Sequence, residues 1–137
     1  MGQTATRLQW SDDYRTGIPT LDDQHLTIFL LYNDVLRALE GRASQHMVAE
    51  TIDSLIFFMR KHFAWEKRFM DSTGYHRAAE HAERHDRFES VAQAFYQYLG
   101  LAGGGETFAS FARAWILEHI HADRDIPAVL AAQGAAE

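Results

Sequence analysis

The chain contains no cysteine, and this absence limits the chemistry that its 137 residues can support. Disulfide bonds and thiolate metal sites are excluded, so any metal ion must be held by nitrogen and oxygen ligands. Proline is also scarce: Pro19 and Pro127 are the only two. Because proline interrupts helices, the long region between them is free to form uninterrupted helices.

Positive charge is in the minority, and long apolar runs are missing. Thirteen Lys and Arg residues stand against 19 Asp and Glu residues, which gives a net charge of -6 with neutral histidines. This balance argues against binding to nucleic acid or to an anionic membrane surface. No stretch approaches the roughly 18 apolar residues that a membrane span needs, and the N-terminus has no run typical of a signal peptide. We therefore expect a soluble, cytoplasmic protein.

Apolar residues are abundant, at 47% of the chain, and they recur at helical spacing. This periodicity predicts four helices, at about 20–40, 44–72, 77–99 and 107–123. Thr20, with Asp23 three residues later, is typical of a helix start, and Gly41, Gly74 and Gly100 are expected to end the first three helices.

The third and fourth helices are expected to be joined by a flexible loop at 101–106. Pro127 is expected to kink or end the fourth helix, and a short helical tail at 128–133 follows. The predicted fold is all-α, an antiparallel up-down-up-down four-helix bundle with an N-terminal arm. We expect a single domain over 1–137, with the arm at 1–19, the bundle at about 20–126 and a short C-terminal tail. Trp10 in the arm is expected to pack across an end of the bundle.

Several polar residues occupy positions on the apolar helix faces. His62 and Glu66 form one pair at i, i+4 spacing, and His81 and His85 form another, so each pair shares one face of its helix. Buried imidazoles and carboxylates cost free energy unless they are paired or bind a metal ion. The first and fourth helices add three more such residues, which are His25, His119 and Asp123.

Each of these residues alone has an ordinary explanation, either as a satisfied core histidine or as a surface pair. Their joint occurrence on four apolar faces does not, because an unneutralised set would destabilise the core. Five imidazoles and two carboxylates are too many for one tetrahedral zinc and too rich in nitrogen for calcium or magnesium. They suit two first-row ions, and the mixture of ligands fits iron. The other three histidines, His46, His76 and His121, fall outside these faces, and we expect them to be solvated.

The chain resembles the hemerythrin family, and more narrowly the bacterial single-domain hemerythrins. The resemblance covers nearly the whole chain, and the order and spacing of its motifs are far more specific than one His-x-x-x-His pair. It is carried by Trp10, Gly17-Ile18-Pro19, Leu21-Asp22-Asp23-Gln24-His25, His62-Phe63-Ala64-Trp65-Glu66, Gly74-Tyr75, His81, His85 and Trp115-Ile116-Leu117-Glu118-His119-Ile120.

The resemblance implies a role for each candidate residue. One iron would be held by His81, His85 and His119, and the other by His25 and His62. Glu66 and Asp123 would bridge the two ions together with an oxo or hydroxo group. The second iron would then have five ligands rather than six, and dioxygen would bind at its open position. Four aromatic residues lie on or near the apolar faces and either keep this pocket dry or simply pack in the core, namely Phe29, Phe63, Trp65 and Trp115.

The sequence departs from the family pattern after His119. The family usually has three residues between the His-Ile pair and the aspartate, whereas here only His121 and Ala122 stand between Ile120 and Asp123, and Arg124 occupies the usual position. We favour Asp123 as the bridging residue because a regular helix keeps it about 40° from His119, on the same face. Asp125 is the alternative if the helix loosens before Pro127. Lys67 also replaces the acid or amide that usually follows Glu66.

The leading functional hypothesis is reversible binding of dioxygen for carriage, storage, delivery or sensing. One alternative is a diiron oxidase or peroxidase, although ferritin-like diiron enzymes use two Glu-x-x-His motifs and this chain has one match, Glu118 to His121. The other alternative is an interaction module that responds to dioxygen through the arm. The sequence identifies no protein partner.

Overall fold

The computed structural model describes residues 6–41, 43–98 and 103–136, and these residues form helices connected by short segments. No helix in this part of the chain is long and apolar enough to cross a membrane. The elements are a short 3-10 helix, η1 (Asp12–Tyr14), followed by α1 (Pro19–Glu40), α2 (Gln45–Thr73), α3 (Ala78–Tyr98), α4 (Gly104–Asp123) and α5 (Ile126–Ala136).

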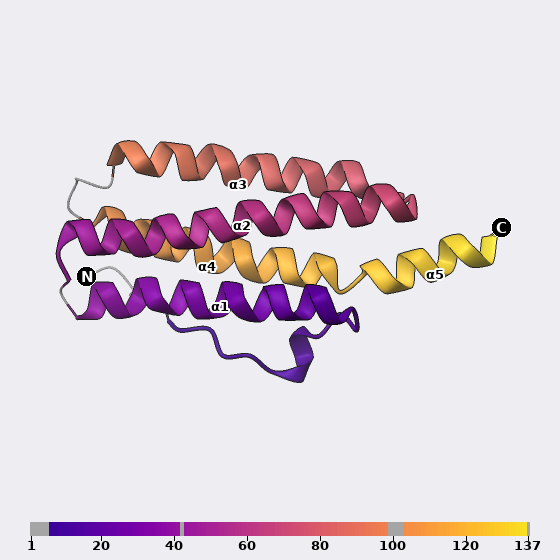
Figure 1. Ribbon diagram of the computed structural model, residues 1–137, viewed down its shortest axis with the longest axis horizontal. Helices are drawn as coiled ribbons and strands as arrows, with labels where there is room; N and C mark the ends of the chain where they lie inside the picture. The colour runs from indigo at the N-terminus through magenta and orange to yellow at the C-terminus, as the bar shows by residue number, and fades with distance from the viewer. Residues whose placement is uncertain (1–5, 42, 99–102, 137) are drawn as a thin grey trace.

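Helices α1 to α4 lie side by side with alternating directions (Figure 1). Neighbours in sequence pack against each other, and α4 also packs against α1, which closes the bundle. The predicted all-α four-helix bundle is therefore confirmed. Helix α5 projects beyond the end of the bundle where α2 turns into α3 (Figure 1).

The apolar core has two parts. The larger cluster fills the interior along the bundle, and its largest fully buried side chains include Tyr32, Phe29 and Phe88. A smaller cluster lies where α1 begins, α2 ends and α5 begins, and its buried members are Leu21, Met70, Tyr75 and Ile126. The first turn of α5 is thus part of a buried cluster.

The N-terminal arm lies along α1 rather than across an end of the bundle (Figure 1). The rings of Trp10 and Tyr14 pack on Phe29, with centroid distances of 5.4 and 5.1 Å. The Asn33 side chain accepts a hydrogen bond from the Leu8 amide and donates one to the Leu8 carbonyl, at 2.9 and 2.8 Å. These contacts hold an extended segment that has no partner strand.

The start of α1 differs from the prediction. The helix begins at Pro19, one residue before the predicted cap Thr20, because proline is suited to the first position, where no amide donor is needed. The Asp22 carboxylate accepts hydrogen bonds from the amide and the hydroxyl of Thr16, both at 2.8 Å. The predicted ends of α2 agree with the structure: Ser44 caps its N-terminus, and Gly74 follows it in the left-handed conformation.

Helix α4 begins at Gly104, three residues earlier than predicted, so residues 104–106 are not loop. A Cβ atom on Gly105 would lie 2.8 Å from Leu39 Cδ2, so glycine allows this turn to approach the end of α1 closely. Gly100, the predicted end of α3, and residues 101 and 102 of the predicted loop lie outside the described residues.

Pro127 stands in the first turn of α5, where its missing amide donor costs nothing. The predicted tail is therefore a helix of 11 residues. Gln133 joins it to the α2–α3 turn, since its side-chain oxygen accepts from the His76 amide at 2.9 Å and its nitrogen donates to the Gly74 carbonyl at 3.0 Å. Helix α5 is thus fixed to the bundle at two positions, by the buried side chain of Ile126 and by the hydrogen bonds of Gln133.

Replacement of Ile126 by alanine tests whether α5 is part of the packed structure. Its side chain is fully buried in the smaller cluster, so the cavity is expected to lower the free energy of unfolding by about 2–5 kcal/mol. Urea unfolding monitored by circular dichroism measures the change. Met47→Ala is the control, because Met47 is 55% exposed and its loss should change stability by less than about 0.5 kcal/mol. If Ile126→Ala lowered the free energy of unfolding as little as Met47→Ala, α5 would not be packed against the bundle.

Candidate metal centre

All seven residues predicted from the sequence meet inside the bundle. Each of the four bundle helices contributes at least one, near the end that α5 adjoins. Six of the side chains are at most 4% exposed, and His85 is 12% exposed. The contributions are His25 from α1, His62 and Glu66 from α2, His81 and His85 from α3, and His119 and Asp123 from α4.

The spacing of these residues explains why they face inward together. Three pairs stand at i, i+4, which places both members on one side of a helix, and that side also carries the buried apolar residues. On α2, for example, Leu55 and Met59 precede His62 on the buried face and Met70 follows Glu66. The helix packing that buries these apolar side chains also buries the polar ones.

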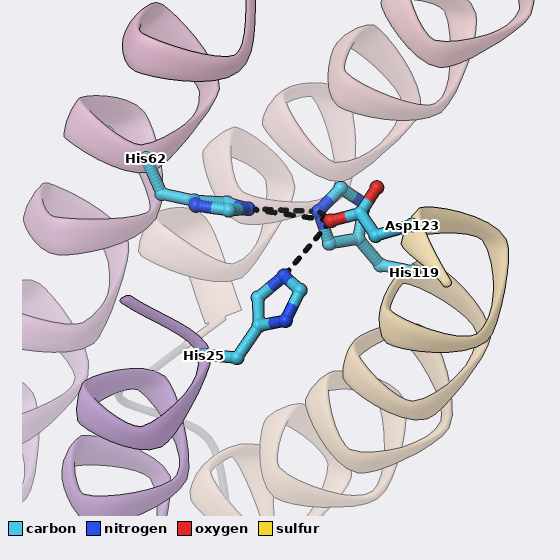
Figure 2. A group of neighbouring side chains, drawn as sticks. All are labelled: His25, His62, His119 and Asp123. Carbon is cyan, nitrogen blue, oxygen red and sulfur yellow. Dashed lines mark hydrogen bonds and ion pairs between the residues drawn. The ribbon is translucent and has the colours of Figure 1, made fainter. Parts of the chain in front are cut away.

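Four of the residues converge from three helices in Figure 2. His25 Nε2 lies 2.8 Å from Asp123 Oδ2, and His119 Nε2 lies 3.0 Å from the same oxygen. His62 Nε2 approaches from α2 and lies 2.9 Å from His119 Nε2. The ligand-type atoms of these four side chains all lie within 4.8 Å of one another.

Glu66 is the centre of a second group. Its Oε2 atom lies 3.1 Å from His85 Nε2, 3.1 Å from His119 Nε2 and 3.2 Å from His62 Nε2. Glu66, His81 and His85 also bring their ligand-type atoms within 4.8 Å of one another. The two groups adjoin, since His81 Nδ1 is 3.5 Å from Asp123 Oδ1.

The pKa of His119 is shifted in the opposite direction from the pKa values of His62 and His81. Burial lowers the pKa of His119, but the adjacent Asp123 and Glu66 carboxylates outweigh it and raise that pKa to about 10. Burial lowers the pKa of His62 and of His81, and the carboxylates only partly oppose it. Burial would raise the pKa of Glu66, yet His119 and His62 hold it well below its usual value. His62 and His81 therefore present the neutral form that binds metals.

The side chains alone leave this centre incomplete. Five of its buried polar atoms have no hydrogen-bond partner, although nearly all buried polar atoms in proteins have one. His119 is charged, whereas His62 and His81 are neutral. A bound cation would give a partner to Glu66 Oε1 and to Asp123 Oδ1, so the residues fit a metal site. The unpartnered atoms are His25 Nδ1, Glu66 Oε1, His81 Nδ1, His119 Nδ1 and Asp123 Oδ1.

Gln24 is a site residue that the sequence reasoning did not assign. Its Oε1 atom lies 2.7 Å from His62 Nδ1, so the imidazole N–H donates to this amide and Nε2 faces the centre as an acceptor. Such second-layer hydrogen bonds orient metal-binding histidines. The only sequence signal was its position beside His25, because the packing of α1 on α2 brings it to His62.

Aromatic rings cover part of the centre. Phe63 stacks on His85 with a centroid distance of 3.9 Å, and Trp115 stacks on His119 at 4.7 Å. The other two aromatic residues expected at the pocket pack differently: Phe29 contacts the arm, and Trp65 stacks on Phe69 at 5.2 Å.

The remaining histidines, His46, His76 and His121, are exposed, as expected for residues outside the apolar faces.

The two candidate bridging aspartates differ sharply in the exposure of their side chains. The Asp123 side chain is fully buried, whereas the Asp125 side chain is 62% exposed and lies 4.0 Å from Arg77. The helix stays regular through Asp123, so Asp125 does not reach the centre.

Comparison with known proteins gives consistent matches. Residues 16–126 match the model of the hemerythrin HHE cation binding domain. The chain is 29% identical over 117 residues to the bacteriohemerythrin of Pseudomonas aeruginosa strain PAO1, covering 85% of this chain and 76% of that protein. It is 28% identical over 110 residues to the bacteriohemerythrin of Methylococcus capsulatus, covering 79% and 83%.

A eukaryotic relative matches to a similar extent: a hemerythrin-like protein of Naegleria gruberi is 28% identical over 111 residues, covering 81% of this chain and 82% of that protein. The family match includes all seven residues of the buried centre and spans well over half of the chain. The chain therefore belongs to the hemerythrin family of HHE cation-binding domains.

Proposed function

We propose that this protein is a non-haem diiron protein that binds dioxygen reversibly. The observation that carries the proposal is the convergence of five imidazoles and two carboxylates, drawn from all four bundle helices, in a site almost closed to solvent. A set of nitrogen and oxygen ligands of this size suits two first-row ions, and iron in particular. The relatives named bacteriohemerythrin support the same assignment.

In this proposal Glu66 and Asp123 would each help to hold both ions. Glu66 Oε2 already contacts His62 on one side and His85 on the other, at 3.2 and 3.1 Å. Asp123 likewise reaches His25 through Oδ2, at 2.8 Å, and His81 through Oδ1, at 3.5 Å. Each carboxylate thus spans imidazoles of both proposed ligand sets, as a bridge requires.

The histidines divide unequally between the two ions. We assign His81, His85 and His119 to one ion and His25 and His62 to the other, as the family resemblance implies. His119 Nε2 lies 3.1 Å from Glu66 and 3.0 Å from Asp123, and it contacts His62 as well, so it adjoins both sets. The pair His25 and His62 has one imidazole fewer, which leaves room for dioxygen on that side. Two ferrous ions, when bound, supply the two electrons that this binding requires.

The chain itself keeps the dioxygen side dry. His25 is fully buried and His62 is 1% exposed, and Gln24 holds the His62 ring in place. Trp115, stacked on His119, and Phe63, stacked on His85, cover adjacent parts of the centre. Excluding water limits proton transfer to the bound gas, which favours its release unchanged over its reduction.

The enzyme alternative loses its sequence support. The Glu-x-x-His match of ferritin-like enzymes falls on Glu118 and His121, and both are exposed rather than turned toward the centre. The described site also has no carboxyl group beyond the two proposed bridges among its clustered metal-ligand candidates. A binding protein is therefore the function that we propose.

Anaerobic reconstitution with ferrous iron tests this function. We expect about two irons per chain, a new visible absorption band on exposure to air, and loss of that band on evacuation. Metal analysis and optical spectra before and after each step give the result. A single tightly held zinc with no iron, or a band that evacuation never reverses, would contradict the proposal.

The assignment of Asp123 is tested by paired substitutions. We expect Asp123→Ala to lose iron or the oxygenated spectrum, because it removes a buried bridging carboxylate. Asp125→Ala should retain both, since Asp125 is exposed and pairs only distantly with Arg77. Iron content and the optical spectrum are the measurements, and the reverse pattern would show that the helix opens before Asp123 in solution.

A further inference from the structure

Three hollows beside α3 reach the centre. A groove of about 650 Å³ between α2 and α3 reaches His81 and His85. A pocket of about 450 Å³ between α3 and the junction of α4 and α5 also reaches His81. A hollow of about 200 Å³ between α3 and α4 reaches His119. His25 and His62 line none of these three.

The α2–α3 groove gives the most direct access to a ligand. Its walls carry small side chains, with Ala64 on α2 and Ala78 and Ala82 on α3. His85 lies on its floor beside Phe63 and is the most exposed of the seven side chains, at 12%. The narrow alanine side chains leave open a path that larger residues would fill.

The charges around the three hollows differ in a way that matters for a cation. The α2–α3 groove has two cations and three carboxylates, and both cations are neutralised: Arg60 bonds to Glu89 at 3.0 Å, and Lys67 bonds to Asp71 at 2.9 Å. The third carboxylate, Asp86, has no ion-pair partner among the described residues. This groove therefore attracts positive ions.

The hollows on the other side of α3 attract cations less. The larger pocket balances three arginines against three carboxylates. The smaller hollow has Arg84 and Arg87 against the single carboxylate of Glu118, so its charge is positive. Neither arginine has an ion-pair partner in the described part of the chain. A divalent cation approaching His119 from this side meets two guanidinium groups and one carboxylate.

We propose that divalent metal ions enter and leave the centre through the α2–α3 groove, with Asp86 drawing them in. The ion held by His81, His85 and His119 is loaded first, because His81 and His85 line this groove. The ion held by His25 and His62, which line none of the three hollows, is loaded second. This inference rests on the proposed metal centre and adds the route and order of its loading. Charge at the mouth acts on the rate of entry, because fields over a charged cleft raise the local concentration of ions of opposite sign.

A matched pair of substitutions tests the route. Ala82→Leu narrows the α2–α3 groove, and Ala114→Leu narrows the hollow between α3 and α4; both alanines are exposed. Uptake of ferrous iron by the apo protein under anaerobic conditions is followed by stopped flow, and release is followed by transfer to a chromogenic chelator. We expect Ala82→Leu to slow uptake and release several-fold by the same factor, with unchanged metal content at equilibrium. Ala114→Leu should leave both rates unchanged.

A second pair tests the charge at the mouth. We expect Asp86→Asn to slow uptake several-fold at low ionic strength, and the difference to shrink at about 0.15 M salt, where charges are screened beyond about 8 Å. Asp53→Asn, an exposed aspartate on α2 outside the groove, should have no effect. Equal effects of the two substitutions, or no effect of either, would overturn the role of Asp86.

The outcomes separate the route from the centre itself. Slowing by Ala114→Leu, or rates unchanged by Ala82→Leu with two irons still bound, overturns the route and leaves the proposed function intact. A wild-type chain that binds no iron overturns both. Circular dichroism of each apo variant reports folding, and Ala64→Leu on the opposite wall of the groove replaces Ala82→Leu if that variant fails to fold.

Discussion

The burial of two carboxylates among five imidazoles is the constraint on which the rest of this structure depends. Glu66 and Asp123 are fully buried, and His119, whose pKa these carboxylates raise to about 10, supplies a compensating charge. Breaking such a buried set is costly, because each remaining charge then lacks a partner. Metal ions that bind only the folded arrangement stabilise it, so folding and metal binding are coupled at this point.

The helices of the bundle bring these side chains together through regular spacing along the chain. Pairs at i, i+4 on α2, α3 and α4 present two ligand-type side chains each, and α1 adds His25 together with Gln24, which orients His62 across the helix interface. The end of the bundle nearest the centre is closed by Leu21, Met70 and Ile126, the last of which comes from α5. A polar site is thus enclosed by apolar packing on the sides that must stay dry.

The imidazoles of the centre differ in their exposure to solvent, and this difference bears on the chemistry of the centre. His25 and His62 are buried, and in the proposed function a small uncharged gas would be held beside them, away from protons. His85 lies on the side of α3, in a groove whose lining includes alanines from both α2 and α3. A charged, hydrated ion needs an open path with favourable charge, whereas dioxygen does not. Under the proposed function, one centre would combine a closed side for the gas with an open side suited to metal exchange.

The sequence by itself determined the helices of the bundle and the identity of the seven polar residues that meet in the centre, because both depend on local spacing that a 3.6-residue period makes visible. It could not determine the start of α1, where Pro19 and the bonds from Thr16 to Asp22 override the cap predicted at Thr20. Nor could it place Gln24 beside His62, or the first turn of α5 in a buried cluster. The pattern around Asp123 left Asp125 open, and the regular course of α4 buries only Asp123. These features arise from contacts between segments distant in sequence, which only the packing of the helices against one another decides.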